Sequence, residues 1–270
     1  MKGIALGSQK VVLFFPVLSL LLSLGSAAGG EPHSEALKER IIHQFSGKAP
    51  REWGEKVTGV KTRLNTDRPA IALTLDACGG TTGGGFDTKL IAYLEREKIP
   101  ATLFISGPWI DTHREVFQTL AQQSLFEIEN HGRHHKPCSV SGRSVYGIRG
   151  PSSVAELIDE IEIHARRMER QTGRLPRCYR PGTGYCDEIG VQVANALGYE
   201  VVNYSVLGDA GGTYPKRKVR EALLRALPSS IVLLHMNRPE GETAEGVMEA
   251  IPELRKRGIT FHRLSEHSLR

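Results

Sequence analysis

The chain has 270 residues, of which 40% are hydrophobic and 24% are charged, a composition typical of a globular protein. This length accommodates one sizeable domain or two small ones. The formal net charge of +5 is modest, and no dense block of lysine and arginine is interleaved with aromatic residues, so the composition does not predict a nucleic-acid-binding protein.

The first 28 residues have the layout of a secretory signal peptide. Lys2 and Lys10 provide a positive start, residues 11–24 form an apolar run, and residues 26–28 are small, as a cleavage site requires. The run is short for a membrane span, so an uncleaved anchor is the less favoured alternative and no stable membrane span is expected. We therefore expect cleavage after Ala28 and a secreted or periplasmic protein.

Beyond this segment, strand and helix patterns alternate along the chain. Residues 29–67 are a lead-in segment with a short helix at 35–45, for which Ser34 is a candidate N-cap. Ser153 and Glu156 form a capping box at the start of a long helix. The predicted strands are 70–75, 101–105, 126–129, 178–180, 200–206, 231–235 and 261–264. The predicted helices are 87–98, 111–123, 153–173, 187–197, 216–227 and 243–257.

Strand–helix alternation of this kind builds a parallel α/β architecture, and about seven strands suit either an open sheet or a barrel. Polar residues fall repeatedly at or just after the carboxyl ends of the predicted strands. They are Asp76, His131, Arg180, Asp209 and His235. Because the catalytic groups of β/α barrels lie at the carboxyl ends of several strands, this placement predicts a barrel with its active face at that end.

His131 and His135 are four residues apart in a segment that reads N-H-G-R-H-H-K-P. Two imidazoles at this spacing can face one divalent cation if the turn is helical or tightly curled. Two surface histidines in a loop would give the same pattern, so the spacing alone is a moderate signal.

Asp76 directly follows a buried apolar strand, where a carboxylate without a partner is costly. The Arg180 guanidinium is a candidate partner, and a purely structural ion pair is the alternative. His235 ends a Leu-Leu-His run, a place where a histidine taken alone is more often a core residue than a catalyst.

The mature part of the chain contains four cysteines, Cys78, Cys138, Cys178 and Cys186. An oxidising compartment would permit disulfides, and the sequence leaves their pairing open. No C-x-x-C spacing is present, so a zinc ribbon is not predicted, and buried free thiols are the alternative to disulfides.

Together, the motifs resemble one known family. In chain order they are T-L-D-A at 74–77, K-I-P-A-T-L-F-I-S-G at 98–107, H-x-x-x-H with a nearby proline at 131–137, Y-R-P-G at 179–182 and I-V-L-L-H at 231–235. No single motif is specific, but their order and spacing over residues 68–265 resemble the polysaccharide deacetylases, carbohydrate esterase family 4. The resemblance implies a catalytic domain at 68–270 and a distorted (β/α) barrel of about seven parallel strands.

The resemblance also implies catalytic roles for three residues. Asp76 matches the family's general base, and Arg180 matches the arginine that orients this base. His235 matches the general acid.

Binding roles follow from the same resemblance. His131 and His135 match the family's metal ligands, so the expected cofactor is a divalent cation, Zn²⁺ or alternatively Co²⁺. Leu234 matches the leucine that lines the acetyl pocket, and we assign Tyr185 to substrate binding as well.

The sequence departs from the family at the position after Asp76. The family usually has a second aspartate there that binds the metal, and this chain has Ala77. Because a catalytic zinc site normally keeps three protein ligands, another oxygen should take its place, with Asp76 itself, Asp87 and Asp209 as candidates.

Two further departures surround the histidines. Lys136 is inserted before Pro137, and the extra His134 leaves open whether His131 pairs with His134 or with His135. The segment 182–184, Gly-Thr-Gly, replaces bulkier residues that often line the family's substrate groove.

We therefore expect a secreted, metal-dependent hydrolase that removes N-acetyl groups from a polysaccharide, acting on a carbon–nitrogen bond other than a peptide bond. One alternative is a non-catalytic glycan-binding barrel that lost its metal with Ala77. Another is a hydrolase of a different carbon–nitrogen bond on the same fold. The expected partner is an N-acetylated polysaccharide, and the sequence defines neither the glycan nor the oligomeric state.

Overall fold

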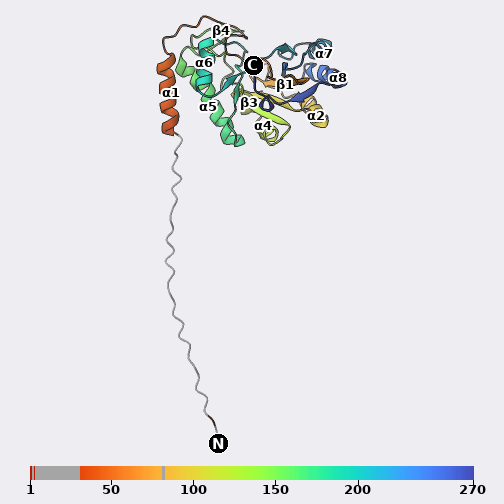
Figure 1. Cartoon of the computed structure of the whole chain (residues 1–270), viewed down its shortest axis with the longest axis horizontal. Coiled ribbons are helices and arrows are strands. Elements are labelled where there is room, and N and C mark those ends of the chain that lie inside the picture. The colour runs from red at the N-terminus through yellow and green to blue at the C-terminus, as the bar shows by residue number, and fades with distance from the viewer. Residues whose placement is uncertain (2, 4–30, 81–82) are drawn as a thin grey trace.

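The computed structural model describes residues 1, 3, 31–80 and 83–270 (Figure 1). The predicted apolar run at 11–24 and the cleavage site after Ala28 lie outside the described residues. Within the described part of the chain, no helix combines the length and the apolar character that crossing a membrane requires.

Helices and short parallel strands alternate over most of the chain. The strands are β1 (Ala70–Ala77), β2 (Ala101–Ile105), β3 (Phe126–Asn130), β4 (Ser144–Val145), β5 (Ile148–Arg149), β6 (Cys178–Tyr179), β7 (Glu200–Val201), β8 (Val206–Leu207), β9 (Ile231–His235) and β10 (Thr260–His262). The helices are α1 (Glu31–Phe45), α2 (Thr88–Arg96), α3 (Gly107–Thr112), α4 (Arg114–Ala121), α5 (Val154–Thr172), α6 (Glu188–Ala196), α7 (Lys216–Leu224) and α8 (Thr243–Lys256), with a short 3-10 helix at Leu264–Glu266.

All strands of the main sheet run parallel, in the order β7-β6-β3-β2-β1-β9-β8, with β10 paired to the beginning of β1. The two outermost strands of this order are close in sequence, because β7 ends at Val201 and β8 begins at Val206. Since so short a connection cannot cross a flat sheet of this width, the sheet curls back toward itself. The predicted distorted (β/α) barrel of about seven parallel strands is confirmed.

The alternation of side chains in β1 divides the core in two. Ile71, Leu73, Leu75 and Ala77 pack in an outer apolar cluster with residues of α2, α3, α4, α7 and α8. The residues between them face inward, where Ala70 and Ala72 belong to a smaller cluster inside the curled sheet. Thr74 and Asp76 continue this inward-facing series toward the carboxyl end of the strand.

The lead-in segment packs on the barrel. Helix α1 lies beside α5 and α6 (Figure 1), and its Ile41 and Phe45 are buried in a third apolar cluster with residues of those helices. Isolated bridges then connect Gly54 to Cys186 and Lys61 to Val202. This segment therefore contributes to the same end of the sheet as the loops that carry the polar residues.

Several predicted elements differ from those observed. The strand predicted at 200–206 is divided into β7 and β8, since residues 202–205 leave the sheet where it turns from one edge to the other. Helix α1 begins at Glu31, so Ser34 lies inside it and is not its N-cap.

The predicted helix at 111–123 is two helices, α3 and α4. Ser106 caps α3 by accepting a hydrogen bond from Trp109 N, and a proline in the first turn favours this early start. His113 then has a non-helical backbone, which separates the two helices. The hairpin formed by β4 and β5 was not predicted.

Candidate active site

The register of the central strands brings the first two polar groups together. In the parallel pairing of β1 with β9, Asp76 lies opposite His235. Residues paired in this way point to the same face of a sheet, so both side chains face the inside of the barrel at the carboxyl ends of their strands.

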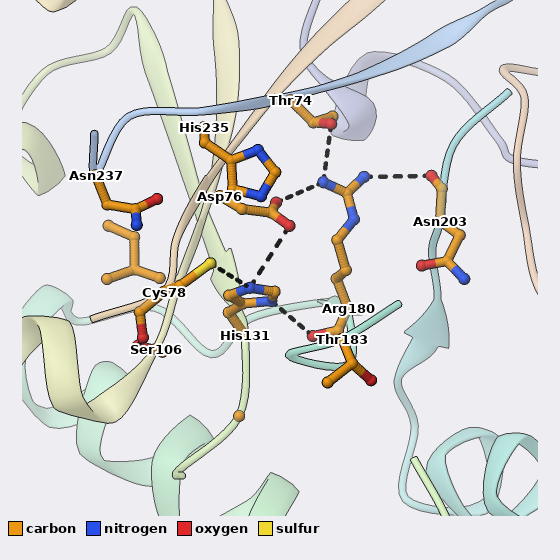
Figure 2. A network of polar contacts seen from close by, with 12 residues as sticks. Thr74, Asp76, Cys78, Ser106, His131, Arg180, Thr183, Asn203, His235 and Asn237 are labelled. Carbon is orange, nitrogen blue, oxygen red and sulfur yellow. Dashed lines mark hydrogen bonds and ion pairs between the residues drawn. The ribbon is translucent and has the colours of Figure 1, made fainter. Parts of the chain in front are cut away.

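Arg180 lies just beyond β6, and its side chain reaches across the inside of the curled sheet to Asp76 of β1 (Figure 2). Its Nη1 donates hydrogen bonds to Asp76 Oδ1 at 2.7 Å and to Thr74 Oγ1 at 2.9 Å. Its Nε and Nη2 donate to the carbonyl oxygens of Val202 and Asn203. Each of the three guanidinium nitrogens therefore donates to at least one acceptor. Because the guanidinium is held in this way, it fixes the orientation of the Asp76 carboxylate.

The ionisation of Asp76 follows from these contacts. Burial alone would raise the pKa of the Asp76 carboxyl, but the positive charge beside it, above all that of the Arg180 guanidinium, outweighs burial and holds this pKa below its ordinary value. The carboxylate is therefore available as a proton acceptor, as predicted for a general base.

His131 follows β3 and points at the same carboxylate (Figure 2). Its Nδ1–H donates to the carbonyl oxygen of Arg180 at 3.0 Å, so the lone pair is on Nε2. This Nε2 lies 3.5 Å from Asp76 Oδ2 and 3.7 Å from Cys78 Sγ. Burial lowers the pKa of His131, which keeps the ring neutral and suited to binding a metal.

His135 joins His131 because the loop between them is tightly curled and not helical. Gly132 and His135 both have positive φ angles, of 86° and 59°. The two imidazole rings meet edge to face, with centroids 4.8 Å apart. His134 is exposed, so the structure favours His131 with His135 as the working pair. His135 Nε2 is buried and has no hydrogen-bond partner among the described residues.

Two residues from other elements support this loop. The Glu160 carboxylate of α5 accepts hydrogen bonds from the backbone N–H groups of His134 and Lys136. A Cβ at Gly182 would come within 2.3 Å of the His135 backbone, so only glycine permits this close approach. The glycine of the Y-R-P-G motif therefore has a local structural reason, which the sequence alone did not reveal.

His235 is held by Asp209, which follows β8. The His235 Nδ1–H donates to Asp209 Oδ1 at 2.8 Å, and its backbone N–H donates to Asp209 Oδ2 at 2.7 Å. Burial opposes a charged imidazolium, but the Asp209 carboxylate outweighs burial and raises the pKa of His235 well above its ordinary value. A histidine that stays protonated in this way suits a general acid.

The residue that could complete a metal site is Cys78. Its thiol and the imidazole nitrogens of His131 and His135 all lie within 4.8 Å of one another, and this is the one such group among the described residues. The three candidates weighed from the sequence have other partners. Asp209 accepts hydrogen bonds from His235, Asp87 caps α2, and Asp76 accepts a hydrogen bond from Arg180. Sequence reasoning missed Cys78 because it considered only oxygen ligands.

The thiol of Cys78 is activated by its surroundings. Burial raises the pKa of this thiol, but the neighbouring imidazoles of His135 and His235 outweigh burial and lower it to about 7. The other three cysteines are buried free thiols, and Cys138 and Cys186 are paired across an isolated bridge.

The two predicted substrate-binding residues lie in different surroundings. Leu234 is fully buried and belongs to the outer apolar cluster, while the adjacent His235 faces inward, so the role of Leu234 at the acetyl pocket stays a prediction. Tyr185 is half-buried and packs against Trp53 and Tyr146, with ring centroids 5.7 and 5.8 Å away. Trp53 and Tyr146 come from the lead-in segment and the β4–β5 hairpin, and no motif in the sequence pointed to either residue.

The described site agrees with a comparison against protein families, in which the polysaccharide deacetylase family model matches residues 63–202, more than half of the chain. The chain belongs to the polysaccharide deacetylase family. It is therefore classed as a polysaccharide N-deacetylase, a hydrolase of a carbon–nitrogen bond other than a peptide bond, and the predicted resemblance is confirmed.

Individual relatives agree with this assignment. The chain is 23% identical over 265 residues to the peptidoglycan-N-acetylmuramic acid deacetylase PdaA of Bacillus subtilis, covering 92% of each chain. The solved structure of that protein, named as a family 4 carbohydrate esterase, matches with a TM-score of 0.64 at 21% identity and covers 87% of this chain and 88% of the other.

A second similar structure is that of a carbohydrate esterase family 4 pseudoenzyme from Bacillus anthracis. It matches with a TM-score of 0.63 at 19% identity, covering 76% of this chain and 67% of the other. At these identities the structural matches concern the fold, and the chemistry has to be argued from the residues of this chain.

Proposed function

We propose that the chain is a secreted, metal-dependent deacetylase that removes N-acetyl groups from the glycan strands of peptidoglycan. The observation that carries this proposal is the arrangement of Asp76 between the Arg180 guanidinium and the His131 imidazole, with the His235–Asp209 pair on the adjacent strand. This arrangement supplies a proton acceptor and a proton donor on the same face of the barrel.

The residues present fit a divalent metal. His131 and His135 would hold it, since the Nε2 lone pair of His131 is free of the carbonyl contact and His135 has a buried ring nitrogen without a partner among the described residues. When bound, such a metal polarises the acetamide carbonyl and lowers the pKa of water.

The chain's own groups then move the protons. Asp76, kept ionised by Arg180, accepts the proton of the attacking water. His235, kept protonated by Asp209, donates a proton to the nitrogen of the departing amine. Because these two side chains lie opposite each other in adjacent strands, the acceptor and the donor can act on one scissile bond between them.

Peptidoglycan as the substrate is supported by the name of the similar Bacillus subtilis protein. A secreted location is supported by the predicted signal peptide, because peptidoglycan is outside the cytoplasmic membrane. The aromatic group of Trp53, Tyr146 and Tyr185 offers ring faces beside the loops of the site for stacking against sugar rings.

The proposal is tested by measuring acetate release from purified peptidoglycan, with chelator-treated protein and after addition of Zn²⁺ or Co²⁺. His131→Ala and His135→Ala should each lose the bound metal and the activity. His134→Ala removes an exposed imidazole from the same loop and is the matched control, with metal and activity retained.

Elemental analysis of the same three samples separates the possible failures. Metal loss in the His134 variant alone would overturn the choice of ligands. Full acetate release by metal-free protein would overturn metal dependence. Protein that binds metal and glycan but releases no acetate would overturn the catalytic proposal and favour the alternative of a non-catalytic glycan-binding barrel.

A further inference from the structure

We propose that Cys78 is the third protein ligand of the metal, binding as a thiolate in place of the carboxylate that is missing at Ala77. The proposal rests on the metal-dependent function proposed above and adds the identity of the ligand, which makes the site Cys-His-His. Three structural observations carry it.

The first observation is the direction of the side chains at the end of β1. Ala77 is fully buried and packs in the outer apolar cluster, on the face opposite Asp76. Since alternate residues of a strand share a face, Cys78 follows Asp76 inward. In this chain the residue that can reach the site is therefore two positions after the base, and not one.

The second observation is the distance between the ligand atoms. Cys78 Sγ lies 3.7 Å from His131 Nε2, and the ligand atoms of Cys78, His131 and His135 are all within 4.8 Å of one another. Zinc bond lengths of about 2.3 Å to sulfur and 2.0–2.1 Å to nitrogen place tetrahedral ligands roughly 3.3–3.6 Å apart. The ligand atoms are therefore at most about 1.5 Å too far apart, a gap that the side chains would have to close around the ion.

The third observation is that each member is held from behind and points into the same space. The Cys78 carbonyl accepts a hydrogen bond from Ser106 Oγ at 2.6 Å (Figure 2). His131 donates its Nδ1–H to the Arg180 carbonyl, and the backbone around His135 is held by Glu160. Supporting hydrogen bonds of this kind orient metal ligands in proteins.

A thiolate ligand predicts which metals bind. Soft sulfur ligands favour Zn²⁺ and other late transition metals, whereas carboxylate and carbonyl ligands suit Mg²⁺ and Ca²⁺. We expect the chain to select Zn²⁺, with Co²⁺ as a spectroscopic substitute, and to bind Mg²⁺ and Ca²⁺ poorly.

The same thiol also faces His235, whose Nδ1–H donates a hydrogen bond to Asp209. This order of thiol, imidazole and carboxylate resembles that of a cysteine nucleophile. A covalent acetyl-thioester on Cys78, formed as the amine leaves and then hydrolysed, is the rival role for this residue and is one outcome of the test.

The test is titration of metal-free protein with Co²⁺, because a thiolate ligand produces an intense charge-transfer absorption in the near ultraviolet. Unaltered protein should show this absorption. Cys78→Ser should lose the absorption. Its Zn²⁺ affinity should fall by more than roughly 10–100-fold, the range for losing a contact that only supports a ligand. Cys78→Asp should bind Co²⁺ without the absorption. Cys178→Ala, which removes a buried thiol outside the group, is the control and should keep it.

Alkylation gives a second measurement. Cys78 is partly exposed whereas the other three cysteines are buried, so limited alkylation of folded protein should label Cys78 first, and bound Zn²⁺ should slow this labelling. Circular dichroism of each variant confirms folding.

Three results would overturn the proposal: the charge-transfer absorption persisting in Cys78→Ser, labelling unaffected by Zn²⁺, or activity in chelator with acetyl trapped on Cys78. Neither the Co²⁺ titration nor the alkylation depends on deacetylation. A protein that shows the Co²⁺–thiolate absorption but releases no acetate would therefore keep Cys78 as a ligand and reject only the proposed activity.

Discussion

The two halves of the site differ in how completely their polar atoms are paired. On one side, the Arg180 guanidinium donates hydrogen bonds to Asp76, Thr74 and two carbonyl groups. On the same side, the Asp209 carboxylate accepts hydrogen bonds from the side chain and the backbone of His235. On the other, His135 Nε2 has no partner among the described residues.

This difference separates groups that move protons from groups that bind. A fully paired network needs no reorganisation during reaction, which suits acid–base groups whose orientation must be fixed in advance. An imidazole nitrogen left unpaired in a buried position is costly unless a ligand takes it up, which suits a metal site. The predictions below change one half and ask whether the other responds.

The largest effect is expected for Asp76→Asn. The amide keeps the size of the carboxylate but cannot accept a proton, so turnover should fall by about 10²–10⁴-fold, the range for losing a general base. Because the paired half does not bind the metal, metal content should stay unchanged in this variant. Steady-state acetate release and elemental analysis on the same sample measure both.

The matched control is Asp87→Asn. Asp87 is another buried carboxylate, and it caps α2. Turnover should be retained, with little change in stability, because asparagine and aspartate are comparable N-cap residues. Full activity in Asp76→Asn would show that Asp76 is not the base. Loss of metal from this variant would show that Asp76 is a metal ligand.

The next effect concerns stability in acid. His164 of α5 donates its Nε2–H to the Ile105 carbonyl, which also accepts the backbone N–H of His131. Burial lowers the pKa of His164 to about 4, from a value of 6.5 in the unfolded chain. Between these values the unfolded state binds more protons, so the free energy of unfolding decreases as the pH falls. A shift of this size corresponds to about 3 kcal/mol by pH 4.

His164→Gln keeps a donor for the Ile105 carbonyl and removes the titrating group. Urea unfolding at several pH values should therefore show a shallower loss of stability between pH 6.5 and 4 in this variant. His43→Gln, at an exposed position of α1, is the control. Equal slopes for His164→Gln and the unaltered chain would contradict the prediction.

The fold was predictable wherever a pattern of successive residues determines an element. The strands at 101–105 and 231–235 were placed as observed, because each is a run of buried apolar residues between clear boundaries. The division of 200–206 into β7 and β8 depends on the curl of the whole sheet, which no local pattern reports.

The site was predictable to the extent that strand ends predict position. Asp76 and His235 were expected at one face, and they are register partners. The inward direction of Cys78 depends on where β1 ends, and the curled loop at His135 depends on contacts with Glu160 and Gly182 from distant parts of the chain. Contacts of that kind form only in the folded structure.

A smaller effect is expected for Glu160→Gln, which weakens the acceptor that holds the loop of the unpaired half. The amide keeps the shape and one acceptor oxygen, but it loses the negative charge and replaces Oε2, the second acceptor for the His134 N–H, with a donor. Metal affinity should fall by about 10–100-fold, with the acid–base half unaffected once metal is saturating. Zn²⁺ titration measures the metal affinity, and turnover at saturating Zn²⁺ shows whether the acid–base half is unaffected.

Glu162→Gln is the matched control on the same helix. Its carboxylate bonds to Tyr199 and Arg166 and not to the histidine loop, so Zn²⁺ affinity should be unchanged. A variant of Glu160 that binds Zn²⁺ normally would show that the loop keeps its shape without this contact.

The smallest effect is expected at the aromatic group, which lies outside both halves. Tyr146 is 72% exposed on the β4–β5 hairpin, and its ring meets the ring of Tyr185 at 5.8 Å. An aromatic contact contributes about 0.5–1.5 kcal/mol, so Tyr146→Ala should raise KM for a polymeric glycan by roughly 2–10-fold. Because the acid–base half and the metal ligands are untouched, kcat should stay constant, and a short acetylated sugar that cannot reach the hairpin should show no change in KM. Leu227→Ala removes another exposed apolar side chain, from the opposite end of the barrel, and should change neither substrate's KM. A fall in kcat without a change in KM would instead place Tyr146 among the residues that shape the reaction itself.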